Sequence, residues 1–227
     1  MNAVFTNRRD AGKQLARQLT AYADSSDTIV LALPRGGVPV AYEVANRLNL
    51  PLDVCLVRKI GSPYSPETAV GAIAEDALSL NNSGYIAIID RDMIKSFEVQ
   101  QPEIEAIAAQ ARAELRWRDY CYRHYRPMLQ IKNKEVIVVD DGLATGLTME
   151  AAIQALRQHQ PQKIIIAVPV ASSQAIVRLE DRVDELICLF IPNSFGAVGF
   201  WYEDFTQVSH REVCDLLSQK SIGLVGS

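Results

Sequence analysis

Three short runs of this chain are apolar almost throughout, and they limit the fold more than any other feature does. The runs are IVLAL from Ile29, VIVVD from Val136 and IIIAV from Ile164. A strand with one face in water alternates apolar and polar residues, whereas a strand buried on both faces is apolar along its length. Strands of the second kind are typical of a parallel sheet that helices cover on both sides.

Helical patterns separate the strand candidates, so the sequence predicts an α/β fold with a central, mainly parallel sheet flanked by helices. The expected strands are Thr28–Ala32, Leu52–Val57, Tyr85–Ile89, Glu135–Val139, Lys163–Val168 and Leu186–Ile191. The expected helices are Arg9–Tyr22, Val38–Leu48, Met149–His159 and Ser173–Leu179.

The composition limits the class of protein. A chain of 227 residues with 48% hydrophobic content suffices for one domain with an elaboration, so we expect a single domain over residues 1–227. A net charge of −4 without a basic block argues against a nucleic-acid partner. Four widely spaced cysteines argue against a zinc site or a disulfide scaffold and suit a reducing compartment. The polar first residues and the absence of a membrane-length apolar run predict a cytoplasmic protein without a membrane partner.

Three segments do not fit a simple alternation of strands and helices. Residues 60–84, rich in Gly, Pro and Asn, predict a long irregular loop or a short hairpin, which is more often functional than idle. Residues 99–126 predict an amphipathic helix, which either packs against the domain or forms a dimer contact or a wall of the site. Residues 192–208 are rich in Gly and aromatic residues. Ser209 and Glu212 then have capping-box spacing for a last helix.

The segment VIVVDDGLATGLT, residues 136–148, carries the strongest chemical signal. A buried strand ends in two acids, and a loop containing Gly142, Thr145, Gly146 and Thr148 leads into a helix. Glycines let the backbone present its N–H groups to a ligand, and the helix N-terminus adds partial positive charge. Such a loop can therefore bind a phosphate without a lysine.

The two acids, Asp140 and Asp141, repel a phosphate and must face hydrogen-bond donors or a cation, such as sugar hydroxyls or a metal ion. The segment lacks the GK[ST] ending of a Walker A loop and does not match GxGxxG. A phosphate on the loop and hydroxyls on the acids together describe a ribose 5-phosphate.

The longer segment VVDDGLATGLTMEAA resembles the signature of the type I phosphoribosyltransferases, above all the adenine version. The resemblance implies that Asp140 and Asp141 hold the ribose hydroxyls of 5-phosphoribosyl 1-pyrophosphate (PRPP), directly or through Mg²⁺. It also implies a set of 5-phosphate contacts: Gly142, Ala144, Thr145, Gly146, Leu147 and Thr148. The hypoxanthine-guanine branch has an aspartate where this chain has Ala144, which argues against that branch.

Two further segments can meet an anion. LPRGGV follows the first strand and places Arg35 beside Gly36 and Gly37, a second anion-binding turn. In the family this place holds the pyrophosphate loop, and the resemblance puts a cis peptide bond between Pro34 and Arg35. Arg58 and Lys59 end another strand, where two cations are unfavourable without an anion, and the resemblance places such a pair near the pyrophosphate.

The resemblance assigns residues 60–84 to a flexible lid and residues 192–208 to a small hood over the base. The lid carries Glu67 and Glu75, either of which can be the proton donor to the base. In the hood, Phe195 and Trp201 are candidates to stack on a flat heterocycle, although core packing explains them equally well. Glu203 or Asp204 are weaker candidates for a second magnesium.

The resulting prediction is an enzyme that uses PRPP and Mg²⁺ to transfer phosphoribosyl to a nitrogenous, purine-like base and releases pyrophosphate. The resemblance and the 99–126 helix also favour a homodimer. The alternative is a sensor or regulator of the same fold that binds PRPP without turnover. A third reading is a diphosphate-sugar hydrolase or another pentose-phosphate transferase.

Overall fold

The computed structural model describes residues 4–62, 65–75, 85–89, 101–124 and 128–223. By their internal contacts, these residues form two compact units. The first unit comprises Met1–Val54, Leu129–Gly146 and Gln160–Ser227, and the second comprises Cys55–Met128 and Leu147–His159. The units divide where the chain leaves the central sheet after Val54 and builds a separate small sheet. The single domain with an elaboration, expected over residues 1–227, stays a prediction.

A five-stranded parallel sheet forms the centre of the first unit, in the order β2-β1-β6-β7-β8. Its strands are β1 (Thr28–Ala32), β2 (Leu52–Val54), β6 (Glu135–Val139), β7 (Lys163–Val170) and β8 (Glu185–Phe190). The side chains of β1 and of Val136–Val139 are fully or almost fully buried, as the apolar runs predict. The expected α/β fold with a parallel central sheet is confirmed.

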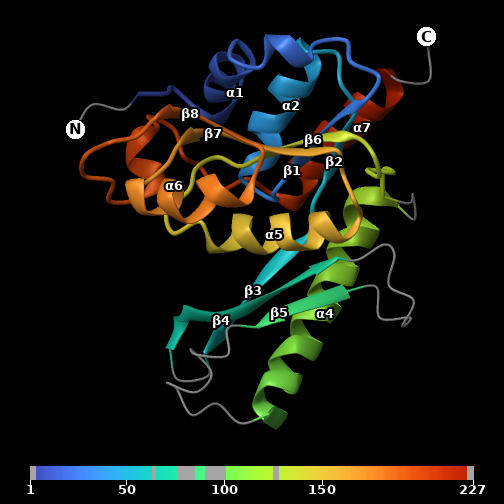
Figure 1. The fold of residues 1–227 in the computed structure, drawn as a ribbon, viewed down its shortest axis with the longest axis vertical. Coiled ribbons are helices and arrows are strands. Elements are labelled where there is room, and N and C mark those ends of the chain that lie inside the picture. Colours follow the sequence, from blue (N-terminus) through green and yellow to red (C-terminus); the bar gives the residue numbers. More distant parts are fainter. Residues whose placement is uncertain (1–3, 63–64, 76–84, 90–100, 125–127, 224–227) are drawn as a thin grey trace. The chain divides into compact units, whose positions relative to one another are not determined.

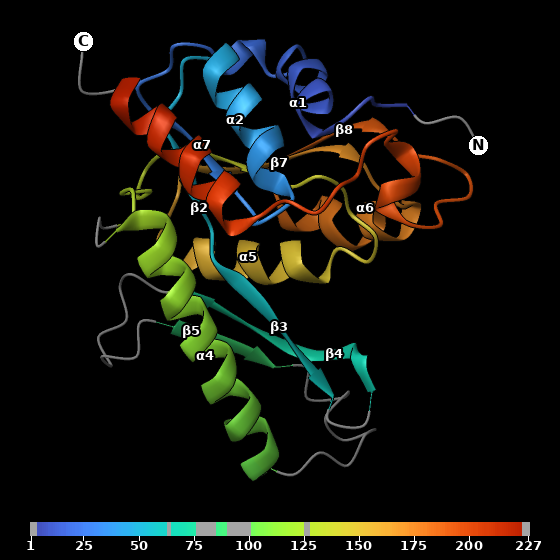
Figure 2. The same ribbon diagram turned by 180° about the vertical axis from the view of Figure 1, so that it is seen from behind.

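Helices cover this sheet. The α-helices of the first unit are α1 (Arg8–Ala16), α2 (Gly37–Arg47), α6 (Ser173–Leu179) and α7 (His210–Gly223), with 3-10 turns η1 (Thr20–Tyr22), η2 (Glu180–Arg182) and η3 (Val198–Trp201). Helices α1 and α2 pack together over one face of the sheet, and α7 packs against α2, whereas α6 lies on the other face (Figures 1 and 2). Within the described part of the chain, no helix combines the length and the apolar character needed to cross a membrane.

The second unit is built on an antiparallel sheet. Strands β3 (Val57–Ser62), β4 (Ser65–Glu75) and β5 (Tyr85–Ile89) pair in that order, and α4 (Gln101–Arg123) and α5 (Leu147–Gln158) pack against β3 and β4. The segment expected to be a lid therefore begins as the paired strands β3 and β4, and residues 63–64 and 76–84 of it lie outside the described residues. The helix expected over residues 99–126 is α4.

The hood includes a segment that the sequence analysis did not connect with it. The backbone N–H groups of Val4 and Phe5 donate to the carbonyl of Trp201, and the N–H of Glu203 donates back to the carbonyl of Phe5. These bonds form a short parallel bridge between Phe5 and Tyr202. The residues near the start of the chain thus form one side of the hood.

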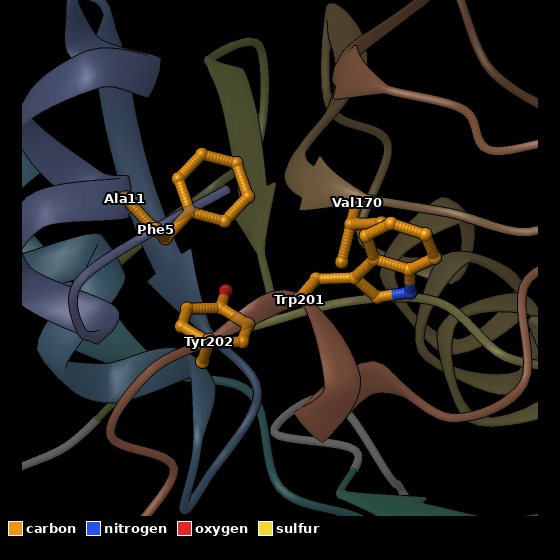
Figure 3. Packing of buried hydrophobic residues seen from close by; sticks show 5 residues of the cluster. All are labelled: Phe5, Ala11, Val170, Trp201 and Tyr202. Atoms are coloured by element: carbon orange, nitrogen blue, oxygen red, sulfur yellow. The ribbon is translucent and has the colours of Figure 1, made fainter. Parts of the chain in front are cut away.

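Apolar packing fixes this junction. Phe5, Ala11, Val170, Trp201 and Tyr202 form a buried cluster, in which the Trp201 indole lies beside Val170 (Figure 3). The rings of Phe5 and Tyr202 have centroids 5.4 Å apart. Because the cluster joins the end of β7, helix α1 and the hood, the hood is a packed part of the first unit.

Replacing Ser209 by Ala should lower the free energy of unfolding by about 1 kcal/mol. The Ser209 hydroxyl accepts a hydrogen bond from the backbone N–H of Glu212 at 3.1 Å and so caps α7, as the capping-box spacing predicted. Urea unfolding measures the change. Ser218→Ala is the control, since Ser218 is exposed in the interior of the same helix and should change the free energy by less than about 0.5 kcal/mol. Equal losses in the two variants would contradict the capping role.

Candidate active site

The two motifs singled out in the sequence meet at one edge of the central sheet. Strand β1 pairs in parallel with β6, with Ala32 opposite Val139, so the PRGG turn and the acid pair leave the sheet side by side. Strand β2 lies on one side of this pair, and β7 and β8 lie on the other. The strand order therefore reverses between β1 and β6, and the carboxyl edge at such a reversal is where open α/β sheets bind ligands.

The PRGG turn and the acid pair approach so closely that Gly36 and Gly37 have no room for a side chain. A Cβ atom on Gly36 would lie 2.0 Å from the Asp141 carboxylate, and one on Gly37 would lie 2.7 Å from the carbonyl oxygen of Val139. Both distances are far inside van der Waals contact, so any side chain at either position would displace the acid pair. The peptide bond between Pro34 and Arg35 is cis, at the position that the family resemblance had indicated.

Asp141 is held on several sides by protein groups. Its carboxylate accepts a hydrogen bond at 2.7 Å from Nε of Arg8, and its backbone carbonyl accepts one at 2.6 Å from the hydroxyl of Tyr202. Burial raises the pKa of Asp141, while the Arg8 guanidinium acts in the opposite direction. Burial, together with the negative charge of Asp141, likewise raises the pKa of the Tyr202 hydroxyl, which keeps it protonated as a donor.

Asp140 precedes this anchored residue and is half-buried. Its Oδ1 accepts the N–H of Asp141 at 2.8 Å, which fixes the turn after β6. Two adjacent carboxylates suit Mg²⁺, which commonly binds one or two carboxylates and completes its shell with phosphate oxygens and water. Within the described ranges no cluster of three or more His, Cys, Asp or Glu side chains could hold a metal ion.

The Gly/Thr-rich loop is fastened to the end of β7. Leu143 exchanges backbone hydrogen bonds with Val170 and Ser172, and the Ser172 hydroxyl donates to the carbonyl of Ala144 at 2.5 Å. The side chains of Ala144 and Thr145 are exposed. Gly146 has a φ of +75°, a left-handed conformation that favours glycine.

The expected phosphate-binding residues follow one another in the chain. Gly142 to Gly146 belong to the first unit, and Leu147 and Thr148 form the first turn of α5 in the second. Gly142 lies against the hood, because a Cβ atom there would come 2.6 Å from Cγ1 of Val198.

A cavity of about 370 Å³ opens beside the acid pair in the first unit. It is lined by Arg8, Arg35, Gly36, Asp141, Val198, Phe205, Gln207 and Val208. The pyrophosphate-loop candidates Arg35 and Gly36 therefore share one hollow with Asp141 and with the hood. A neighbouring hollow of about 280 Å³ continues past Arg8 toward Asn7, Pro39 and Glu212.

The aromatic residue of this cavity is Phe205, which the sequence analysis did not select. Trp201 is 5% exposed, its indole N–H donates to the carbonyl of Phe195 at 3.1 Å, and Phe195 packs against the same buried cluster. Neither of the two expected stacking residues lines the cavity. For both, the structure favours the core-packing explanation, which the sequence left open.

The remaining candidates lie in the second unit. Arg58 forms an ion pair with Glu114 of α4, and the side chains of Lys59 and Glu67 lie outside the described residues. Glu75 accepts two hydrogen bonds from the guanidinium of Arg123, at 2.5 and 2.9 Å, and one from the backbone N–H of Leu56. Arg123 is 3% exposed, so Glu75 serves as its counter-ion, a role that competes with proton donation.

Comparison with known proteins agrees with this geometry. The sequence profile described as phosphoribosyl transferase domain matches residues 5–203. This chain belongs to the phosphoribosyl transferase domain family. The match begins at Phe5 and ends at Glu203, so it includes the N-terminal segment that pairs with the hood, both anion-binding turns and the acid pair.

Relatives within the family support the assignment. A protein of Mycobacterium tuberculosis, provisionally named a phosphoribosyl transferase, is 39% identical over 216 residues, which are 95% of this chain and 47% of that protein. The crystal structure of TT1426 from Thermus thermophilus is 41% identical, with a TM-score of 0.78, and the match covers 95% of this chain and 98% of that one. The uracil phosphoribosyltransferase of Aquifex aeolicus is 30% identical over 70 residues, 31% of this chain and 33% of that one. The chain thus spans about half the length of the mycobacterial relative.

Glu75→Gln should lower the free energy of unfolding by about 3 kcal/mol, because it leaves the buried charge of Arg123 without its main counter-ion. Asp119→Asn is the matched variant. Asp119 also pairs with Arg123, at 2.7 Å, but its side chain is 46% exposed, so its loss should change the free energy by less than about 1 kcal/mol. Urea unfolding followed by circular dichroism compares the two. Equal, small losses would contradict a structural role for Glu75.

Proposed function

We infer that this protein is a phosphoribosyltransferase that binds PRPP with Mg²⁺ and transfers its phosphoribosyl group to a nitrogenous base. The observation that carries this proposal is the meeting of the PRGG turn and the acid pair around one cavity at the point where the strand order reverses. Membership of the phosphoribosyl transferase domain family supports the same reaction class.

The chemistry to be catalysed is displacement at the anomeric carbon of the ribose. The bond from that carbon to the pyrophosphate oxygen breaks, the leaving group takes the electron pair, and a ring nitrogen of the base forms the new bond. Negative charge therefore grows on the pyrophosphate, and Arg35 and the backbone of Gly36 and Gly37 would stabilise it. Arg35 and Gly36 line the cavity beside Asp141, which supports this role. The Gly142–Gly146 loop holds the 5-phosphate, so both ends of the sugar phosphate are fixed, which orients the reacting carbon.

Mg²⁺, when bound through Asp140 and Asp141, would neutralise part of the charge on the pyrophosphate. Each acid has one carboxylate oxygen in a hydrogen bond, Asp141 with the cationic Arg8 and Asp140 with the backbone N–H of Asp141. Because Arg8 pairs the charge of Asp141, Asp140 is the better candidate to meet the metal or the ribose hydroxyls. Family resemblance alone assigns Arg58 and Lys59 to the pyrophosphate. Use of a purine-like base and assembly into a homodimer also stay predictions from that resemblance.

The proposed acceptor site is the hood side of the 370 Å³ cavity, lined by Val198, Phe205 and Gln207. Val198 and Phe205 offer apolar surface to a flat ring, and the Gln207 amide can both donate and accept hydrogen bonds at the ring's edge. Two glutamates were expected as candidates for the proton donor to the base. The side chain of Glu67 lies outside the described residues, and Glu75 is the weaker candidate because its carboxylate is hydrogen-bonded to Arg123.

The test combines two measurements on the same protein. Calorimetric titration with PRPP in the presence of Mg²⁺ measures binding, and pyrophosphate release measures turnover with purine and pyrimidine bases offered one at a time. Asp140→Asn should weaken PRPP binding roughly tenfold or more, the effect expected on losing a charged hydrogen-bonding group. Asp181→Asn is the control, an exposed acid on η2 that should bind like wild type.

The outcomes separate the candidate functions. Pyrophosphate release with one base, weakened in Asp140→Asn, supports the transferase and identifies its acceptor. Tight binding without release from any base would instead favour a PRPP sensor of the same fold. No PRPP binding by the wild-type protein would contradict the ribose-phosphate site itself.

A further inference from the structure

Arg8, which the sequence analysis did not consider, reaches into the centre of the site. It begins α1, and its Nε donates to the Asp141 carboxylate at 2.7 Å. A second nitrogen, Nη1, donates to the backbone carbonyl of Thr206 at 2.8 Å. The guanidinium lies over the Phe205 ring, 3.8 Å from its centroid. One side chain thus connects helix α1, the end of β6 and the hood.

Burial makes this connection strong. The Arg8 and Asp141 side chains are only 10% and 13% exposed, so solvent screens the ion pair weakly. Gly36 closes one side of Asp141, because even a Cβ atom there would overlap its Oδ2. The Asp141 carboxylate therefore has little freedom to turn while Arg8 is present.

The same contacts fix the hood. Phe205 is held between Arg8 and Tyr202, whose ring centroid is 5.0 Å away, and Tyr202 donates its hydroxyl hydrogen to the carbonyl of Asp141. Arg8 and Tyr202 thus bind Asp141 through its side chain and its backbone, and both touch Phe205. The acid pair and the acceptor side of the cavity are aligned by a single set of contacts.

We propose that Arg8 is a positioning residue for PRPP: it orients Asp141 and holds the Phe205–Gln207 wall at the distance from the acid pair that the ligand needs. The inference rests on the proposed function. It assigns Asp141 to the organisation of the site and leaves direct contact with ribose or metal mainly to Asp140.

The contacts made at position 8 require an arginine. A lysine would keep the positive charge, but its ammonium cannot make two bonds in the fixed directions of a guanidinium and stacks less well on an aromatic ring. Arg8→Lys should therefore fold and still lose alignment. Partners that orient a ligand-binding side chain typically matter by about 10- to 100-fold, and we expect the Kd for PRPP to rise by that factor.

The chain offers a matched control in the neighbouring residue. Arg9 also pairs with a carboxylate, Glu43, and lies over an aromatic ring, Tyr42, but 49% of its side chain is exposed and it does not line the 370 Å³ cavity. Arg9→Lys and Arg9→Ala should bind PRPP like wild type. Any general effect of changing a cation at the start of α1 would show in both residues.

The experiment titrates PRPP with Mg²⁺ into wild type, Arg8→Lys, Arg8→Ala and the two Arg9 variants, and records the melting temperature of each. Guanidinium ion is then added to every protein at a concentration that leaves the wild-type melting temperature unchanged. The expected result is weak binding by both Arg8 variants, a near-normal melting temperature for Arg8→Lys, and recovery of binding by Arg8→Ala with guanidinium. Wild type and the Arg9 variants should not respond.

Two results would overturn the inference alone: wild-type affinity in Arg8→Lys, or a loss in Arg8→Ala that follows its melting temperature and is not rescued. The second would make Arg8 a purely structural residue. Failure of wild type to bind PRPP would overturn the proposed function, and the inference with it.

Discussion

Parallel pairing of β1 with β6 is the constraint on which the site depends. The two strands are about a hundred residues apart in the chain, and their pairing brings a cation-bearing glycine turn against two acids. The proposed site needs the cation of Arg35 close to the acids Asp140 and Asp141, yet each must stay available to the ligand. The sheet achieves this by fixing both backbones, and the glycines allow the approach because they present no side chain. In the proposed function, anion recognition would fall mainly to backbone groups and Arg35, and hydroxyl or metal recognition to Asp140.

Around this pairing, the first unit adds an outer layer of contacts that stabilises Asp141. Tyr202 holds its carbonyl and Arg8 holds its carboxylate. Tyr202 belongs to the buried cluster around Phe5, and so does Ala11 of helix α1, the helix that Arg8 begins. The hood is thus connected to Asp141 directly through Tyr202, and through Arg8 by Phe205 and Thr206. Its aromatic residues accordingly differ in role: Phe195, Trp201 and Tyr202 pack in or against the buried cluster, Phe205 lines the cavity, and Phe200 is exposed.

Much of the fold was predictable because its signals are local. Apolar runs located β1, β6 and β7, glycines and prolines located the turns, and the acid pair identified the active edge. Contacts between distant segments were not predictable: Arg8 meets Asp141 across 133 positions and Thr206 across 198, and no periodicity marks such a pair. The sequence left a loop and a short hairpin open for residues 60–84, because Pro66 and the glycines also suit a loop, and the structure shows the hairpin of β3 and β4. In the structure, Pro66 lies near the start of β4, next to the register shifts at Ile60–Ser62, where a missing N–H is tolerated.

The span of these contacts has a consequence for how the protein is made. The ribosome releases Phe5 and Arg8 some two hundred residues before their partners in the hood. Helix α1 can form early, but Arg8 must wait for β6 and then for Thr206, so the cavity is among the last features to be completed. A nascent or truncated chain can therefore contain the ordered sheet and the acid pair and still lack the acceptor wall. Competence to bind the ligand would then report that the chain has been synthesised and folded as far as the hood.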